Sequence, residues 1–172
     1  RLARLVALEE IVEEILERRI VRQFRHGRHR GAVVGFNRNF DHRRQELFSE
    51  ISEPVAEEFV TLASARKLRV IAVYGGVSIV PQIKKAKDAH ILVATPGRLQ
   101  DLIDRRAVNL SGVQVLVLDE ADRMLDMGFK PQVDRILKAM PGDRQTLFFS
   151  ATLDGAVGEL ARAYTNSPAH IE

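Results

Sequence analysis

Three carboxylates stand close together in the string Asp119-Glu120-Ala121-Asp122. The string follows the apolar run 113–118, and an acid at the end of a buried strand is costly unless a cation or hydrogen-bond donors meet it. In nucleotide hydrolases an aspartate in this position holds Mg2+, often through water, and the adjacent glutamate can orient or deprotonate the attacking water. The alternative is that these acids form the first turn of a helix, where the helix dipole favours them.

Two hydroxyls follow the next apolar run. Ser150-Ala151-Thr152 comes after residues 146–149, and its hydroxyls could bond to a neighbouring acid, for which Asp122 is the candidate. Taken alone, the same string is an ordinary helix N-cap.

Paired glycines follow the run 68–73, in the string Tyr74-Gly75-Gly76. Without side chains, they let a backbone approach a phosphate closely, or they make a tight turn. Taken alone, the turn is the simpler interpretation.

The run 90–94 is followed by Thr95-Pro96-Gly97-Arg98. A proline near a helix start is a normal opening. Free amides at that terminus, together with the Thr95 hydroxyl and the Arg98 guanidinium, would suit a phosphodiester. An ordinary capped helix is the competing interpretation.

These strings follow short apolar runs that alternate with helix-like stretches, and the alternation predicts how they are positioned. Continuous apolar runs indicate strands covered on both faces. Strands that alternate with helices predict an α/β fold, a three-layer domain with a mostly parallel sheet flanked by helices. In such sheets, ligands bind where strands end and helices begin. The predicted strands cover 68–73, 90–94, 113–118 and 146–149, and the predicted helices cover 46–65, 78–88, 96–106, 122–139 and 154–165.

The order of these strings resembles the first RecA-like domain of DEAD-box ATP-dependent RNA helicases. Residues 117–129, Val-Leu-Asp-Glu-Ala-Asp-Arg-Met-Leu-Asp-Met-Gly-Phe, resemble the family signature and its helix. Residues 94–99 resemble the RNA-backbone motif, 75–76 the double-glycine RNA contact and 150–152 the coupling motif. The resemblance covers about residues 46–172.

The resemblance implies a domain that binds ATP and Mg2+ and grips single-stranded RNA by its backbone. It implies that Asp119 coordinates Mg2+ through water and that Glu120 activates water, both at the nucleotide site. It implies that Asp122, Ser150 and Thr152 couple hydrolysis to unwinding. The implied RNA-contacting residues are Gly75, Gly76, Thr95, Pro96, Gly97 and Arg98.

The N-terminal part of the chain departs from the family pattern. The family has a phosphate-binding loop of the form Gly-x-x-x-x-Gly-Lys-Thr, but here no lysine precedes Lys67 and residues 31–35 have the wrong spacing. The adenine-reading glutamine motif is unrecognisable, and residues 43–47 keep only the Glu-Leu pair of another RNA motif. Impaired ATP binding is therefore expected, and the alternative function is a non-enzymatic RNA-binding or partner-binding module.

Residues 1–45 form a compositional regime of their own, with eleven of the twenty arginines. Residues 2–16 have helical amphipathic spacing, and 22–44 predict loop or irregular structure around the apolar run 32–34. The segment is either a divergent N-terminal part of the domain or a coding artefact such as a frameshift. Its histidines, His26, His29 and His42, fit no common metal spacing. Residues 46–172 are expected to be the remainder of the domain, ending at an interdomain linker, with the second RecA-like domain missing.

Bulk properties are compatible with a globular domain that binds a polyanion. The 172 residues are 45% hydrophobic and 28% charged, with a net charge of +3, and a basic excess favours partners such as RNA. With no cysteine, a reducing and cytoplasmic setting is expected. The sequence contains no run of eighteen apolar residues, so no membrane-spanning helix is predicted.

Overall fold

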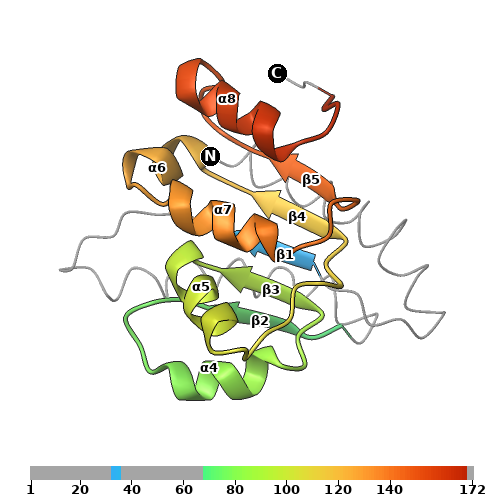
Figure 1. The fold of residues 1–172 in the computed structure, drawn as a ribbon. Helices are drawn as coiled ribbons and strands as arrows, with labels where there is room; N and C mark the ends of the chain where they lie inside the picture. Colours follow the sequence, from blue (N-terminus) through green and yellow to red (C-terminus); the bar gives the residue numbers. More distant parts are fainter. Residues whose placement is uncertain (1–31, 36–67, 170–172) are drawn as a thin grey trace.

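The computed structural model describes residues 32–35 and 68–169, and in this part of the chain a five-stranded sheet carries helices along one face (Figure 1). The strand order is β2-β3-β1-β4-β5, and each pair of neighbours is parallel. The strands are β1 (Ala32–Gly35), β2 (Val70–Val73), β3 (Ile91–Ala94), β4 (Val115–Leu118) and β5 (Gln145–Phe148).

The five strands end level with one another. Gly35 of β1 pairs with Ala94 of β3 on one side and with Leu118 of β4 on the other. Val73 of β2 pairs with the same Ala94, and Phe148 of β5 pairs with Leu118. Because the last residue of every strand lies in one row, the segments after the strands all leave from a single edge of the sheet.

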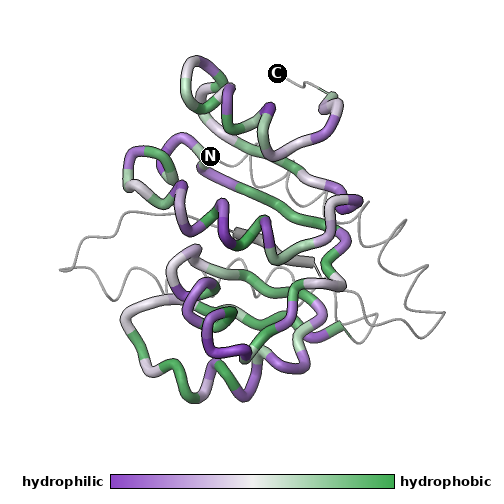
Figure 2. The backbone as a smooth tube through the Cα atoms, in the orientation of Figure 1, coloured by the Kyte–Doolittle hydropathy of each residue, from purple (hydrophilic) through white to green (hydrophobic). Residues whose placement is uncertain are grey.

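The apolar runs explain why the inner strands form. β3 is Ile-Leu-Val-Ala and β4 is Val-Leu-Val-Leu, and all eight residues are buried. Branched side chains suit the pleated backbone, and burial of both faces leaves no polar alternation. Figure 2 shows both strands as hydrophobic segments of the tube. The residues of β5 are half-buried.

Helices α5 and α7 pack against each other in front of the sheet in Figure 1. Leu99 and Leu102 of α5 and Val133 and Ile136 of α7 are buried in the same hydrophobic core as Leu116 of β4. α4 lies beside β2, and α6 packs on α8. The described helices are α4 (Ile79–Ala86), α5 (Pro96–Asp104), α6 (Ala121–Asp126), α7 (Lys130–Lys138) and α8 (Gly155–Tyr164).

Two expectations from the sequence are wrong. The predicted helix 122–139 is broken into α6 and α7, because Gly128 adopts a left-handed φ of 71° that ends the helical path. The segment 22–44 was expected to be irregular, yet its residues 32–35 form β1, which pairs on both sides at the centre of the sheet. The strands predicted at 68–73, 90–94, 113–118 and 146–149 are confirmed with shorter bounds.

Several expectations lie outside the described residues. These are the helices at 2–16 and 46–65, the irregular segments on either side of β1, the histidines at 26, 29 and 42, and the boundary near residue 45. Among the described residues, no helix combines the length and apolar character needed to cross a membrane.

Candidate functional site

The four predicted site loops all begin at the level edge of the sheet. Backbone hydrogen bonds join neighbouring loops there: Thr95 N donates to Val73 O at 3.1 Å, and Phe149 N donates to Leu118 O at 2.7 Å. The loops are thus two pairs, one after β2 and β3 and one after β4 and β5, with the end of β1 between them. This is the edge at which parallel α/β sheets bind their ligands.

Asp119 lies at the end of β4 and is only 7% exposed. Its Oδ1 accepts a hydrogen bond from the backbone N–H of Glu120 at 2.8 Å, which offsets part of the cost of burying a carboxylate. Glu120 has φ 53° and ψ 44°, a left-handed conformation that side chains disfavour. Its Oε2 lies 3.4 Å from Arg123 Nη1. Non-glycine residues held in this conformation cluster at functional sites.

The first turn of α6 is capped from β5 rather than by its own sequence. Glu120 stands at the N-cap position with no side-chain capping bond. Instead, Ala121 N donates to Phe149 O at 3.1 Å, and Asp122 N donates to Ser150 Oγ at 3.2 Å. Two amides that a helix start leaves without partners are thereby satisfied.

The expected pairing of Ser150 with Asp122 is therefore present, but it runs through the Asp122 backbone amide. Thr152, the second hydroxyl of the string, is exposed. The structure thus brings Asp119, Glu120, Asp122 and Ser150 together, and it places Thr152 two residues farther along the same exit.

The glycine pair forms a turn between β2 and α4. Gly76 has φ 83°, a conformation that glycine adopts without strain. Gln82 holds the start of this turn from α4: its Oε1 accepts from Tyr74 N and its Nε2 donates to Tyr74 O, both at 3.1 Å. The bonds from Gln82 to Tyr74 thus fix the backbone just before Gly75 and Gly76. The space beside Gly75 is open, because a Cβ there would meet no atom within 4 Å.

The string after β3 opens α5. Thr95 is the N-cap residue and Pro96, which is buried, takes the first turn. Gly97 is exposed, and a Cβ there would lie 4.0 Å from the Phe129 ring beside α7. The N-terminus of α5 therefore offers backbone N–H groups at the sheet edge, beside the glycine turn.

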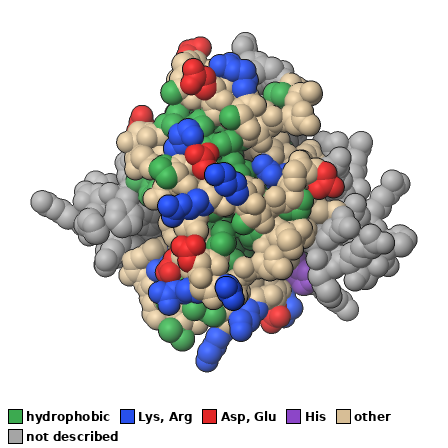
Figure 3. All heavy atoms as spheres, viewed as in Figure 1, with side chains coloured by type: hydrophobic (Ala, Val, Ile, Leu, Met, Phe, Trp, Pro, Cys, Tyr) green, Lys and Arg blue, Asp and Glu red, His purple; other side chains and the backbone are tan. Residues whose placement is uncertain are grey.

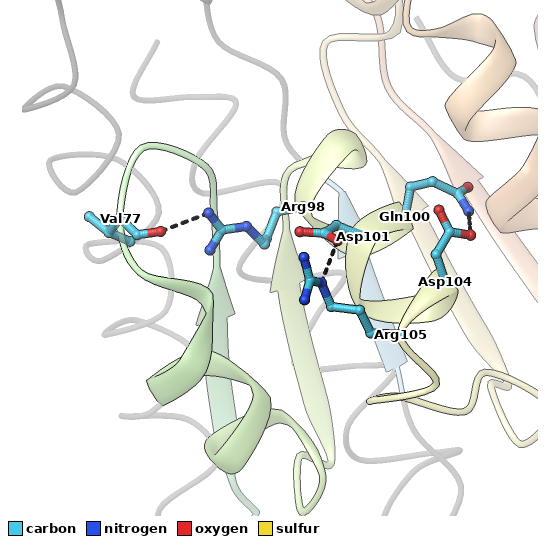
Figure 4. Close-up of polar contacts among 6 residues, drawn as sticks. All are labelled: Val77, Arg98, Gln100, Asp101, Asp104 and Arg105. Carbon is cyan, nitrogen blue, oxygen red and sulfur yellow. Dashed lines mark hydrogen bonds and ion pairs between the residues drawn. The ribbon is translucent and has the colours of Figure 1, made fainter.

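Arg98 points back toward the glycine turn (Figure 4). Its Nη2 donates to Val77 O at 2.8 Å, while Nη1 is buried without a hydrogen-bond partner. Burial lowers the pKa of the guanidinium, with nearby Asp101 opposing the shift. Asp101 itself pairs with Arg105 at 2.6 Å. Arg98 thus ties the two loops after β2 and β3 together, a contact that the sequence did not indicate.

Three residues that hold the site loops carry no functional signal in the sequence: Val77, Gln82 and Phe149. Val77 and Phe149 act through backbone carbonyls, which every residue possesses, so their types carry no signal. Gln82 is a buried polar residue on the inner side of α4, and a lone glutamine in an amphipathic stretch does not reveal that it binds a backbone two turns away.

The residues at the end of β4 suit a hard cation. The carboxylate of Asp119 is an oxygen ligand of the kind Mg2+ prefers, and Mg2+ is often bound through one or two carboxylates with water and substrate phosphates completing its shell. The described residues contain no group of three or more His, Cys, Asp or Glu side chains that could hold a metal ion.

Known proteins resemble this chain in both sequence and fold. A family model for DEAD/DEAH box helicases matches residues 48–160, more than half of the chain. The DEAD-box ATP-dependent RNA helicase CshA of Streptococcus pneumoniae serotype 4 is 43% identical over 124 residues, covering 72% of this chain and 24% of that protein. CshA of Listeria monocytogenes serovar 1/2a is 45% identical over 120 residues, 69% of this chain and 23% of that protein.

Two solved structures show the same architecture. A DEAD box protein from the hyperthermophile Methanococcus jannaschii has a TM-score of 0.68 at 38% identity, covering 80% of this chain and 35% of that one. A hypothetical ATP-dependent RNA helicase from Sulfolobus tokodaii has a TM-score of 0.69 at 28% identity, covering 81% and 39%. The chain spans about a quarter of the length of the CshA relatives. With its RecA-like α/β fold and its matched signature, the chain belongs to the DEAD/DEAH box helicase family.

Proposed function

We propose that this chain forms part of the first ATPase domain of an ATP-dependent RNA helicase, with the nucleotide at the ends of β1 and β4 and RNA on the loops after β2 and β3. The observation that carries the proposal is the level sheet edge, at which the four family strings leave in two adjacent pairs. The relatives, which are named as ATP-dependent RNA helicases, agree with it.

At the nucleotide side, we assign Asp119 to Mg2+, through water, and Glu120 to the attacking water. Mg2+ neutralises charge on the phosphates when it is bound. The buried position of Asp119 fixes its carboxylate at the strand end. The carboxylate of Glu120, whose Oε2 lies 3.4 Å from Arg123 Nη1, is the group that would accept a proton from the attacking water.

At the RNA side, we assign the contacts to the loops after β2 and β3, with the residues Gly75, Gly76, Thr95, Pro96, Gly97 and Arg98. The glycine turn and the start of α5 offer backbone N–H groups to phosphate oxygens, and such contacts carry no sequence information. Since Arg98 holds Val77 O at 2.8 Å, its contribution to RNA binding includes fixing the distance between these two loops.

Coupling between the two sides is assigned to Asp122, Ser150 and Thr152. Asp122 N and Ser150 Oγ join the exits of β4 and β5. A movement of the Ser150 loop would therefore shift the start of α6 and the acids before it. The partner that would move this loop is a second RecA-like domain, which we propose as the partner of this surface.

The N-terminal departure from the family pattern bears on activity. The chain contains no Gly-Lys pair, and its first lysine is Lys67, so the family's phosphate-binding lysine and loop are lacking in residues 1–45. Fixed donors of this kind hold phosphates and stabilise developing charge. We expect weak nucleotide binding and negligible ATP hydrolysis by this chain. We also propose that residues 46–172 are the remainder of this domain, ending at the interdomain linker, and that residues 1–45 are an atypical N-terminal segment, which contributes β1 to the same sheet.

An ATPase assay with and without single-stranded RNA tests the expectation that this chain hydrolyses ATP negligibly. Hydrolysis by the chain should match that of an Asp119→Ala, Glu120→Gln double variant. RNA-stimulated turnover clearly above the double variant would show that the phosphate grip is supplied by other residues, and the expectation of impairment would be wrong.

The runner-up function is RNA binding without catalysis, favoured by the retained RNA-side loops. A titration with single-stranded RNA, with and without ATP and Mg2+, separates the two functions. Nucleotide-independent, salt-dependent binding that weakens on Arg98→Ala favours the binding module. Binding that requires ATP and Mg2+ favours the helicase domain, and binding indifferent to both Arg98→Ala and Thr95→Ala removes the RNA-side assignment altogether.

A further inference from the structure

Charge is segregated along the sheet. Residues 68–106, which form β2, α4, β3 and α5, contain seven lysines and arginines and three aspartates, a net charge of +4. Residues 107–169, which form β4, α6, α7, β5 and α8, contain six lysines and arginines and eight acids, a net charge of −2. Since β2 and β3 stand at one end of the sheet and β4 and β5 at the other, the part of the domain formed by residues 68–169 has a basic end and an acidic end.

Much of the basic excess lies on the outer side of α4. Val80, Lys84 and Lys87 are spaced four and three residues apart, so they share one side of the helix, and Lys87 keeps helical φ and ψ at the C-cap. All three are exposed, as is Lys85. We call these four residues the α4 stripe. Figure 3 shows Lys and Arg side chains gathered over this lower part of the face.

The three lysines of the stripe have no acidic partner among the described residues. The nearest acid in sequence, Asp88, is taken by Arg69 at 3.5 Å. On α5, Asp101 pairs with Arg105 and Asp104 accepts a hydrogen bond from Gln100 (Figure 4). A row of uncompensated cations raises the local concentration of a polyanion.

The stripe continues from the proposed RNA contact. α4 begins at Ile79, three residues after Gly76, so its first turn lies at the glycine turn. Val80, 58% exposed, comes first along the stripe, and a helical rise of 1.5 Å per residue puts Lys87 about 10 Å beyond it. A strand leaving the turn would pass an apolar surface that a base can cover and then the lysines.

We propose that the α4 stripe is a second phosphate-backbone surface, which carries an RNA strand beyond the Gly75-Gly76 turn. This inference rests on the proposed function of that turn. Lysines in the last turn of a helix also stabilise it through the helix dipole. That effect changes helix stability alone, whereas a phosphate surface changes binding with RNA length and salt.

Fluorescence anisotropy of the full chain with labelled oligouridylates of about six and about twelve nucleotides tests the inference, both lengths lying within the range of common single-strand site sizes. The variant is Lys84→Gln, Lys85→Gln, Lys87→Gln. The control, Arg135→Gln, Lys138→Gln, Arg162→Gln, removes three exposed charges from α7 and α8. Thermal unfolding of each variant checks that the fold is retained.

The wild-type chain should bind the longer oligonucleotide more tightly. The stripe variant should lose about tenfold in affinity for it at low salt, with the slope of log K against log salt smaller by about 2, since each phosphate contact to a single strand contributes about 0.7. Its affinity for the shorter oligonucleotide should change by less than about twofold, and the control variant should affect both lengths alike.

Other outcomes overturn the inference. If the stripe variant weakens both lengths equally, or matches the control, the stripe carries no strand, while the proposed function survives on the binding of the shorter oligonucleotide. Polyglutamate provides a further comparison. If the longer oligonucleotide alone binds the wild type and the stripe variant equally, but polyglutamate displaces it only from the wild type, the surface serves an acidic protein instead. If neither oligonucleotide binds, the proposed RNA function fails together with the inference.

Discussion

At the scale of single residues, the most informative contact is the bond from Asp122 N–H to Ser150 Oγ. The Ser150 hydroxyl, in the loop after β5, accepts from an amide in the first turn of α6. This bond therefore helps to position the acidic residues around that turn. The sequence indicated that these two residues would meet, but the structure shows that the partner is the amide, which any residue at position 122 would supply. The side chain of Asp122 is therefore left for a role other than holding Ser150.

Replacement of Ser150 by alanine should lower the free energy of unfolding by about 1 kcal/mol, because the Asp122 amide loses its acceptor. Thr152→Ala is the matched control: Thr152 is exposed, and surface changes of this kind usually stay within about 0.5 kcal/mol. Urea denaturation measures both, and equal effects for the two variants would contradict the capping role of Ser150.

At the scale of elements, the break between α6 and α7 separates two functions of this stretch. α6 follows the acids Asp119 and Glu120, whereas α7 packs on α5 and can take a different direction from α6. The cause of the break is Gly128, whose left-handed φ an L-residue adopts only at a cost. The amphipathic spacing of residues 122–139 continues across the break, which is why the sequence predicted a single helix.

Gly128→Ala should destabilise the chain by about 1–2 kcal/mol, the cost of a left-handed alanine. Gly142→Ala is the control, since a Cβ at either position meets no atom within 4 Å and Gly142 has no positive φ. The difference between the two variants in thermal or urea unfolding reports the backbone strain, and similar midpoints would show that the turn relaxes without cost.

A second link between elements joins α7 and α8. Tyr164 OH donates to Asp134 Oδ1 at 2.6 Å, and Lys130 Nζ lies 2.8 Å from Asp134 Oδ2. The bond to Lys130, then that to Tyr164, lowers the pKa of Asp134, while burial, followed by the bond to Asp134, raises the pKa of Tyr164.

Tyr164→Phe should cost about 1.5 kcal/mol, the low end for a hydrogen bond to a charged group, because the Asp134 side chain is 33% exposed. Because the folded pKa of Asp134 lies below its unfolded value, the contribution is complete above about pH 5. It is lost as the pH falls from the ordinary aspartate pKa through the lower folded pKa. The stability difference between wild type and Tyr164→Phe should therefore shrink below pH 4, measured by urea unfolding at each pH. A pH-independent difference would contradict the link.

At the scale of the whole molecule, the sheet depends on β1. This strand pairs with β3 and β4 simultaneously, so it joins the basic end of the domain to the acidic end. The described structure has no direct pairing between β3 and β4. Loss of β1 would therefore remove the strand pairing that links β2 and β3 to β4 and β5, and would leave the packing of α5 on α7 as a contact between the two ends.

Val33→Pro should cost about 3 kcal/mol or more, because proline removes a donor from a strand paired on both sides. Val33→Thr keeps the N–H and the branched side chain, and it serves as the control for backbone pairing. Circular dichroism and thermal unfolding measure both. A folded Val33→Pro variant with an unchanged melting temperature would show that β1 does not hold the sheet together.

How much of this could be predicted differs between the two halves of the chain. β3 and β4 were predictable because four consecutive buried apolar residues have few alternatives to an inner strand. β1 was not, because Ala32-Val33-Val34 is short and surrounded by arginine, histidine and glycine, and its place depends on pairing with partners far along the chain. The site loops were predictable as strand exits. The role of Arg98 was not, since its acceptor is a carbonyl.

The bonds between the exits of β4 and β5 have a kinetic consequence. Phe149 N, Ala121 N and Asp122 N all donate across the same junction, to Leu118 O, Phe149 O and Ser150 Oγ. Amides that open together share one opening free energy, so their protection against deuterium exchange changes together. These three should form one protected group that slows or quickens as a unit, so an isotope label at this junction would time any motion that passes between the two strands.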